Sequence, residues 1–414
     1  MGSVCELKFD AISVLEQKSF VPDEFVCLFQ ESDRRRQQKV EEEEGDVVYS
    51  APREFVLHRL DLLGYTREHA RNHFEKWLEQ ERMTYSEFDN EGDGSWASEI
   101  AQALQHLSYV EWMSRARDVL PTRFDFTRAM DEYKDETDRQ MRDLQGGWLF
   151  YDGSVLPIIR SLLEAFPEVR EVSLDVGELI DAQEKLCETR RQPSIDGRSD
   201  LQPTVIIAEG STDITVLKRS LQKLYPYLTD YFTFFDYDGP KPDGGSNYVV
   251  KFLRAFAATR INTNILAVFD NDAAGIEALN LASRLPLPAN IKVTKLPDIE
   301  LARAYPTIGA QGVHKIDING KAVSIELFLG RHNLSADDGA LIAVTWNGSI
   351  SAGGRYQGEI NEKRRIFERF LAETSRDEGF GFYRARFPEL VLLWELIFTL
   401  ARSPQRPVLL RREL

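Results

Sequence analysis

The stretch TVIIAEGSTD (residues 204–213) is a short apolar run that ends abruptly in charged and small residues. A continuous apolar run of this length, without polar alternation, is typical of a strand buried on both faces of a parallel sheet. Gly210 would allow a sharp turn after the strand, and Ser211 is a good N-cap for a helix. The stretch therefore predicts a strand, a turn and a helix in direct succession.

Working outward, this pattern repeats along the chain. Further apolar runs occupy residues 231–235, 265–269 and 291–296, and helical periodicity occupies residues 214–224, 248–258 and 273–285. Strands that alternate with helices form a parallel sheet with helices on its faces. We therefore expect an α/β domain over residues 204–340, with a mostly parallel sheet flanked by helices.

The flanking regions have a different texture. Residues 1–190 are expected to be a largely α-helical domain with little β structure, including a strand or hairpin at 4–15, an acidic loop at 37–46 and a helix at 125–144. A polar, proline-containing linker is expected at 191–203. Residues 341–414 are expected to be a C-terminal helical extension, with a polar turn region at 347–358 before helices at 358–373 and 388–401.

Composition restricts the class of protein. The chain has 414 residues, a formal charge of −16 and three isolated cysteines, none in a CxxC pair. Isolated cysteines argue against a zinc site or a disulfide framework and suit a reducing compartment. No signal peptide and no membrane-spanning run is visible, so we expect a soluble, cytoplasmic protein without membrane contact. The net acidity means that any nucleic-acid surface must be local or supplied by a partner or an oligomer.

Acidic residues follow two of the predicted strands. Glu209 and Asp213 lie across the turn after the first strand, and Asp270 and Asp272 follow the third strand, 264–269. The carboxyl ends of parallel strands meet at one edge of a sheet, and residues two apart in extended chain point to the same side. We therefore expect these four carboxylates to lie close together.

Crowded carboxylates repel one another unless a cation neutralises them. Mg²⁺ or Mn²⁺ would do so, since these ions take hard oxygen ligands and keep water molecules for a phosphate substrate. The pattern predicts Glu209, Asp213, Asp270 and Asp272 as metal ligands. Lys295, at the end of the fourth strand, is the candidate for stabilising charge on the phosphate, although a solvated lysine is the alternative.

The motifs Glu209-Gly-Ser-Thr-Asp213 and Asp270-Asn-Asp272 resemble the two signature motifs of TOPRIM domains, which occur in primases, topoisomerases, recombination proteins and OLD-type nucleases. The pair looks closest to the OLD-like nucleases. The resemblance implies a Glu that acts as base or ligand and Asp residues that bind metal. The stretch HRLDLLGYT (residues 58–66) is similar to HEPN/Toprim-associated proteins, which implies a role in bacterial anti-phage defence.

Several weaker signals stay open. Glu277 and Glu326 are possible additional ligands. The segment DYDG (residues 236–239) is better interpreted as a turn than as a phosphatase-type motif. Arg53 and His58 roughly fit the spacing of the RNase motif of HEPN families, but five residues apart on a helix they do not share a face.

These signals favour a divalent-metal-dependent nuclease acting on DNA or RNA. The cysteine content and length speak against primase and topoisomerase activity, and a response-regulator-like phosphoacceptor domain does not require the Glu-Gly turn. The rival from another class is a catalytically degenerate TOPRIM scaffold or sensor that binds metal, nucleotide or nucleic acid for a partner. The resemblance also implies a regulatory partner such as an ATPase, and homo-oligomers are possible.

Overall fold

The computed structural model describes residues 3–37, 46–90, 95–122, 138, 141–142, 154–177, 179–181, 183–191, 202–235, 246–259, 261–310, 312–350 and 355–402. Four sequence predictions lie wholly or mostly outside these residues: the loop at 37–46, the helix at 125–144, the linker at 191–203 and the 236–239 motif. The chain divides into two compact units, which we call unit 1 (Met1–Gln192 with Arg402–Leu414) and unit 2 (Pro193–Ala401). Among the described helices, none is both long and apolar enough to cross a bilayer.

Unit 1 contains a five-stranded antiparallel sheet with the order β2-β1-β5-β4-β3. The predicted hairpin at 4–15 is present, but the β content is larger than expected, because strands far apart in sequence complete the sheet. β1 pairs with β5, more than 150 residues later, through contacts such as Leu7 with Leu174. The strands are β1 (Val4–Phe9), β2 (Ile12–Lys18), β3 (Arg34–Gln37), β4 (Asp46–Pro52) and β5 (Glu171–Gly177).

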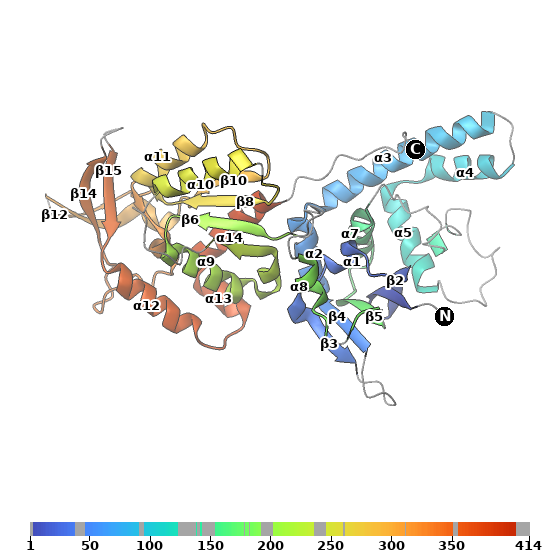
Figure 1. Ribbon diagram of the computed structural model, residues 1–414, viewed down its shortest axis with the longest axis horizontal. Helices are drawn as coiled ribbons and strands as arrows, with labels where there is room; N and C mark the ends of the chain where they lie inside the picture. Colours follow the sequence, from blue (N-terminus) through green and yellow to red (C-terminus); the bar gives the residue numbers. More distant parts are fainter. Residues whose placement is uncertain are drawn as a thin grey trace. The chain divides into compact units, whose positions relative to one another are not determined.

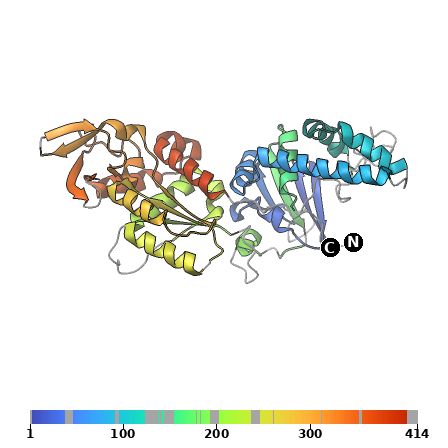
Figure 2. The ribbon, with the colours of Figure 1, turned by 90° about the horizontal axis from the view of Figure 1, so that it is seen from above.

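Helices still make up most of the described regular structure of unit 1, and α2, α3 and α7 pack together beside the sheet (Figure 2). The largest fully buried side chain is Trp112 of α5, which contacts Phe74 of α3. The helices are α1 (Asp23–Val26), α2 (Arg53–Leu62), α3 (Arg67–Asn90), α4 (Ser95–His106), α5 (Tyr109–Val119), α7 (Leu156–Ala165) and α8 (Leu186–Arg191).

Unit 2 is built on a four-stranded sheet, order β10-β8-β6-β7, in which every neighbouring pair is parallel. The four strands are β6 (Thr204–Ala208), β7 (Phe232–Phe234), β8 (Ile265–Phe269) and β10 (Ile291–Lys295). The helices between them are α9 (Ser211–Leu224), α10 (Ser246–Thr259) and α11 (Ala273–Ala282). The predicted parallel sheet flanked by helices is therefore confirmed.

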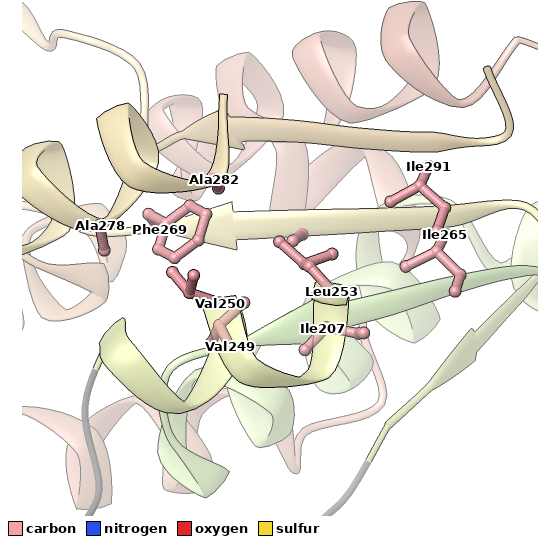
Figure 3. Close-up of a cluster of buried hydrophobic side chains, with 10 residues drawn as sticks. Ile207, Val249, Val250, Leu253, Ile265, Phe269, Ala278, Ala282 and Ile291 are labelled. Carbon is pink, nitrogen blue, oxygen red and sulfur yellow. The ribbon is translucent and has the colours of Figure 1, made fainter. Parts of the chain in front are cut away.

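Both faces of this sheet are covered, as the apolar runs predict. One face packs on α10 and α11, where Leu253 and Ala278 meet Ile207, Ile265 and neighbouring strand residues (Figure 3). The other face packs on α9 and α14 (Pro388–Ala401), which are joined by a hydrogen bond from Trp394 Nε1 to Ser220 Oγ of 2.8 Å (Figure 1). Because both faces of the sheet are covered by helices, a ligand would bind at the carboxyl ends of the strands.

A second four-stranded sheet, order β12-β11-β14-β15, follows the parallel sheet in the chain (Figure 1). The predicted polar turn region at 347–358 is wrong, because most of its residues belong to two antiparallel strands that pair with each other. Gly348 of the first strand lies opposite Gln357 of the second. The remaining strands and helices are β9 (Asn271–Asp272), β11 (Tyr305–Gly309), β12 (Gly312–Ile316), β13 (Ala322–Val323), β14 (Val344–Ile350), β15 (Arg355–Ile360), α12 (Lys363–Thr374) and α13 (Phe380–Arg386). Short 3-10 helices lie at Glu31–Asp33, Leu120–Thr122, Pro226–Tyr231, Glu300–Ala304 and Ile325–Phe328.

Candidate active site

The two acidic motifs meet at one edge of the parallel sheet. Glu209 follows β6 and Asp270 follows β8, and these two strands are hydrogen-bonded neighbours. The backbone N–H of Asp270 donates to Glu209 Oε1 over 3.1 Å. The structure therefore brings together residues that are 61 positions apart, at the place that the strand order implies.

The first motif is held by Asp213 rather than by Ser211. Gly210, not Ser211, is the residue before α9, and its N–H donates to Asp213 Oδ2 over 2.9 Å. The predicted N-cap at Ser211 is therefore wrong. The predicted sharp turn between strand and helix is present, but it does not depend on the conformational freedom of glycine, since Gly210 has an extended φ of −139° and a Cβ there would make an ordinary 3.4 Å contact. An Asp in the first turn of a helix satisfies an N–H that would otherwise lack a partner.

The second motif is capped and clamped. Asp272 is the N-cap of α11, and its Oδ1 accepts a hydrogen bond from the N–H of Gly275 over 2.7 Å. Its Oδ2 accepts from the side-chain amide of Gln357, and Gln357 Oε1 in turn accepts from the N–H of Ala274 over 3.2 Å. Gln357 thus fixes both the carboxylate and the start of α11. Nothing in the local sequence around Gln357 predicts this role.

Glycine at position 275 is required by a close backbone approach. A Cβ at Gly275 would lie 2.2 Å from the carbonyl oxygen of Asp270, and 2.9 Å from its carbonyl carbon. Both are backbone atoms, so no side-chain rotation relieves the clash. The glycine lets the first turn of α11 close onto the loop that carries Asp270.

Burial, followed by the charges of neighbouring carboxylates, disfavours the ionised forms of two of these acids, Asp213 and Asp270. Burial raises the pKa of Asp213 to about 7, with further contributions from the charges of Glu326 and Glu209. Burial also raises the pKa of Asp270 well above its ordinary value, and the charges of Asp213, Glu209 and Asp272 add to it. Within this structure the four acids therefore form one interacting group, which we call the acid cluster.

Glu326 joins the acid cluster from the 3-10 helix Ile325–Phe328. Glu326 is only 6% exposed, and its Oε2 accepts a hydrogen bond from Ser324 Oγ over 2.6 Å. The charge of Glu326 contributes to the raised pKa of both Asp213 and Asp270. Glu277 is not among the main charges that act on these two aspartates. Of the two additional candidates, the structure therefore places Glu326 at the site.

The cation beside the acid cluster is Lys363, which sequence reasoning missed. Burial lowers the pKa of Lys363, but the charges of Glu326, Glu359 and Asp270 outweigh it and raise the net pKa above its usual value. Its Nζ lies 3.0 Å from Glu359 Oε1. Lys363 opens α12 directly after Glu362, which adopts a left-handed conformation with φ of 55°. The run EKRR (residues 362–365) gives no local signal that separates this lysine from its basic neighbours.

Lys295 has a different environment from the one expected. Its Nζ lies 2.8 Å from Asp298 Oδ1, which also accepts a hydrogen bond from Asn271 Nδ2 over 2.7 Å. Among the described residues, the ion pair of Lys295 is with Asp298. Lys295 is therefore connected to the Asp270–Asp272 loop through Asp298 and Asn271.

The donor chemistry at the acid cluster fits a hard divalent cation, because all the donors are carboxylate oxygens. As they stand, however, no three carboxylate, histidine or cysteine side chains in the described part of the chain are arranged to hold a metal ion. Glu209, Asp213 and Asp272 each direct one oxygen to a backbone N–H. Metal binding would require some of these side chains to rotate.

The raised pKa values predict a pH dependence of stability. The folded protein holds a proton on Asp213 up to about pH 7, whereas the unfolded chain releases it near its ordinary value of 3.8. Between these values the folded state binds more protons, so the free energy of unfolding falls as the pH rises. We expect the metal-free protein to lose stability between pH 5 and pH 8, and Mg²⁺ or Mn²⁺ at pH 8 to restore it. Thermal unfolding at both pH values would measure this.

The matched control for this prediction is Asp213→Asn, which cannot ionise. The difference in unfolding midpoint between pH 5 and pH 8 should be smaller in this variant, by roughly 2–4 °C for each kcal/mol of repulsion removed. Identical pH dependence in the two proteins would show that Asp213 is not strained by its neighbours.

The possible RNase pair in unit 1 receives no support. The guanidinium of Arg53 donates to the carbonyl oxygen of Leu163 through Nε (3.1 Å) and Nη2 (2.6 Å), which ties α2 to α7. His58 lies on the exposed side of α2. Arg53 therefore has a structural role.

Comparison with known proteins gives one match. Residues 1–189 match the family described as HEPN/Toprim N-terminal domain 1. No curated protein and no solved structure matches the chain. The matched range lies in unit 1, so it links the chain to HEPN/Toprim proteins and suggests a nuclease-like function, while the acid cluster lies beyond it.

Proposed function

We propose that unit 2 contains a TOPRIM domain, over residues 204–340, and that it hydrolyses phosphodiester bonds of DNA or RNA with Mg²⁺ or Mn²⁺; the match of residues 1–189 to the HEPN/Toprim N-terminal family supports this proposal. The observation that carries this proposal is the acid cluster at the carboxyl edge of the parallel sheet, where burial and the neighbouring carboxylate charges raise the pKa of Asp213 and Asp270. Such mutual repulsion is costly in a fold unless a cation offsets it. We propose further that this TOPRIM domain is of the OLD-like nuclease type.

The roles follow from the positions of the side chains. Asp213, Asp270 and Asp272 would hold the metal with Glu209, and Glu326 is the fifth carboxylate within electrostatic range. A bound divalent ion supplies an activated water and neutralises charge on the phosphate. Glu209 serves as ligand or as general base, with its orientation set by the N–H of Asp270.

Lys363 is the better candidate than Lys295 for stabilising charge on the phosphate. Its raised pKa keeps it protonated at neutral pH, and its field reaches Asp270 and Glu326. Both lysines form an ion pair, but that of Lys295 is with Asp298, which is not a member of the acid cluster. A fixed ammonium group at the edge of the acid cluster would lower the energy of a transition state that gains negative charge.

Two matched variants test this assignment. Lys363→Met should lower kcat for nucleic-acid cleavage by about 10²-fold, since it removes one charge that acts on the reacting group. Lys295→Met should change kcat by less than about threefold, because its ion pair is outside the acid cluster. Single-turnover cleavage assays would measure both. The reverse ranking would reinstate Lys295 as the cationic catalytic residue.

The activity itself is tested with purified protein, supercoiled plasmid, single-stranded DNA and tRNA. Each substrate is incubated with Mg²⁺, Mn²⁺ or EDTA, and the products are resolved on denaturing gels. We expect cleavage of at least one substrate with metal and none with EDTA. Absence of cleavage under every condition would contradict the proposal.

A second candidate is a scaffold or sensor that binds metal, nucleotide or nucleic acid without hydrolysis. The observation that favours it is that three of the carboxylates point an oxygen to backbone N–H groups instead of converging on an ion. Calorimetry separates the two functions. Metal binding in the absence of any cleavage would favour the scaffold.

The biological setting rests on the resemblance alone. We propose a role in bacterial antiviral defence in the cytoplasm, with a regulatory partner such as an ATPase and possible homo-oligomers. Co-purification from the native host would identify a partner, and a phage-plating assay would test the defence role.

A further inference from the structure

In the second sheet of unit 2, the strand register shows which side chains lie on the same face. Val313 pairs with Ile308, Ile308 with Thr345, and Thr345 with Glu359. Directly paired residues project to the same side of a sheet, and so do residues two apart along a strand. We call this side the outer face, and its members are Gln357, Glu359, Thr345, Ile308, Val313 and Lys315.

The alternation of burial agrees with this assignment. On the opposite side, Tyr305, Val344 and Ile360 are almost completely buried. On the outer face, Glu359, Ile308 and Val313 are exposed. At β11, β14 and the end of β15 the outer face is therefore the more exposed side, whereas both sides of the edge strand β12 are exposed.

One end of the outer face touches the acid cluster. Gln357 donates to the carboxylate of Asp272, and Glu359 contacts Nζ of Lys363. Both residues belong to β15, so the sheet continues directly from the edge where the carboxylates gather.

The other end of the outer face is apolar and open. Ile308 is 41% exposed and Val313 is 67% exposed, and every residue of the edge strand β12 is exposed. Val313 on the edge strand and Ile308 on the strand beside it thus place two adjoining branched aliphatic side chains in water, next to an open strand edge.

The charge at this end suits a polyanion. Lys315 is exposed on β12, and within the described residues it forms no ion pair. It pairs in register with Pro306, which places it beside Val313 on the outer face. An uncompensated lysine at this position provides local attraction in a chain whose net charge is −16.

The hairpin of β11 and β12 is also fixed relative to the acid cluster. The side-chain oxygen of Asn319, just after β12, accepts a hydrogen bond from the N–H of Ile299 over 3.1 Å. Ile299 lies just before the 3-10 helix that leads into β11. The N–H of Gly320 donates to the carbonyl of Asn271 over 3.1 Å. Asn271 stands between Asp270 and Asp272, so both stems of the hairpin are joined to the acidic loop.

We propose that the outer face is the binding surface for the nucleic-acid strand that enters the acid cluster. The sugars and bases contact Ile308 and Val313, a phosphate pairs with Lys315, and the chain continues past Gln357 toward Lys363. This inference rests on the proposed nuclease function, since it assigns the substrate path of the same site.

The experiment uses the full chain and two variants of exposed residues, Val313→Ser and Lys315→Glu. Binding of a fluorescent single-stranded oligonucleotide is measured by anisotropy, with Asp270→Asn in every protein to prevent cleavage, and cleavage kinetics are measured without that change. We expect Kd and KM to rise roughly tenfold in Lys315→Glu, with kcat nearly unchanged. The slope of log K against log salt should fall in magnitude by about one.

Two matched controls accompany them. Tyr356→Ala removes a side chain that is 64% exposed on the opposite side of the same sheet, and Lys185→Glu changes an exposed lysine in unit 1. Both should leave affinity within about twofold of the parent protein, apart from a small loss from the added negative charge. If Lys185→Glu and Lys315→Glu lost affinity for the oligonucleotide equally, the change in net charge alone would explain the loss. That result would overturn the inference.

The remaining outcomes separate the inference from the proposed function. Unchanged binding in both outer-face variants, with cleavage abolished by Asp270→Asn, overturns the inference alone. Binding that depends on Val313 and Lys315 without any cleavage by the parent protein supports the inference and contradicts the nuclease function. A change from dimer to monomer in size-exclusion chromatography, with unchanged affinity, would show that β12 joins two copies of the chain instead.

Discussion

Asp270→Asn is expected to abolish metal-dependent cleavage and, at the same time, to stabilise the metal-free protein. The variant keeps the shape of the side chain and removes the charge that burial and Asp213, Glu209 and Asp272 disfavour. Loss of a ligand at the centre of the acid cluster should reduce the cleavage rate by about 10³-fold or more. The two effects have opposite signs, which is what a functional site built at the expense of stability would show.

The stability arm is measured by thermal unfolding at pH 8 in EDTA. We expect a higher midpoint in Asp270→Asn, by about 2–4 °C for each kcal/mol gained in a domain of this size. With saturating Mg²⁺ or Mn²⁺ the order should reverse, because the metal stabilises only the parent protein.

Asp298→Asn is the matched control, since it neutralises a nearby carboxylate whose pKa is lowered rather than raised by its surroundings. Hydrogen bonds from Lys295 and Asn271 lower the pKa of Asp298, so its charge is favourable in the folded state. Its removal should leave the unfolding midpoint unchanged or slightly lower. A gain in stability in Asp298→Asn equal to that in Asp270→Asn would mean that general acidity, not the acid cluster, limits stability.

Gly275→Ala is expected to be one of the most damaging single-methyl changes in unit 2. The added Cβ would lie 2.2 Å from the carbonyl oxygen of Asp270, and relief requires α11 to move away from the acidic loop. We expect a loss of about 3 kcal/mol or more in the free energy of unfolding, together with loss of cleavage. Chemical denaturation and the cleavage assay would measure the two effects.

Gly381→Ala is the control with the opposite expectation. Nothing lies within 4 Å of a Cβ at Gly381, which is in α13. Replacement of a helical glycine by alanine in open space should stabilise the protein by up to about 1 kcal/mol. If the two glycine variants unfolded alike, the close approach at Gly275 would not exist in solution.

The strand and helix pattern of the parallel sheet could be predicted from sequence because it is a local property. The run 205–208 is apolar at every position, and the same holds for 265–269, so burial on both faces follows without knowledge of the rest of the chain. The acids at the ends of these runs also follow, since strand ends in a parallel sheet share one edge. Glu209 and Asp270 lie together in the structure for this reason.

The strands at 344–350 and 355–360 could not be predicted in the same way. Their run TWNGSI and the facing RYQGEI contain glycines and polar residues that are equally common in turns. Pairing between the two strands, with an irregularity between Trp346 and Gly348, overrides this local preference. β propensity depends on the neighbouring strand, so it is a weak guide where that neighbour is unknown.

The amino-acid sequence by itself determined the parallel sheet, its buried strands and the edge at which four carboxylates gather. Only the tertiary structure decided that Asp213 caps its own helix, that Gln357 clamps Asp272, and that Lys363 rather than Lys295 is the cation beside the acids. The physical reason is distance along the chain. Strand burial and strand ends are encoded in a few adjacent residues, whereas Gln357 and Lys363 reach the site through the register of strands and helices that lie far away in sequence, and register is set by packing between elements.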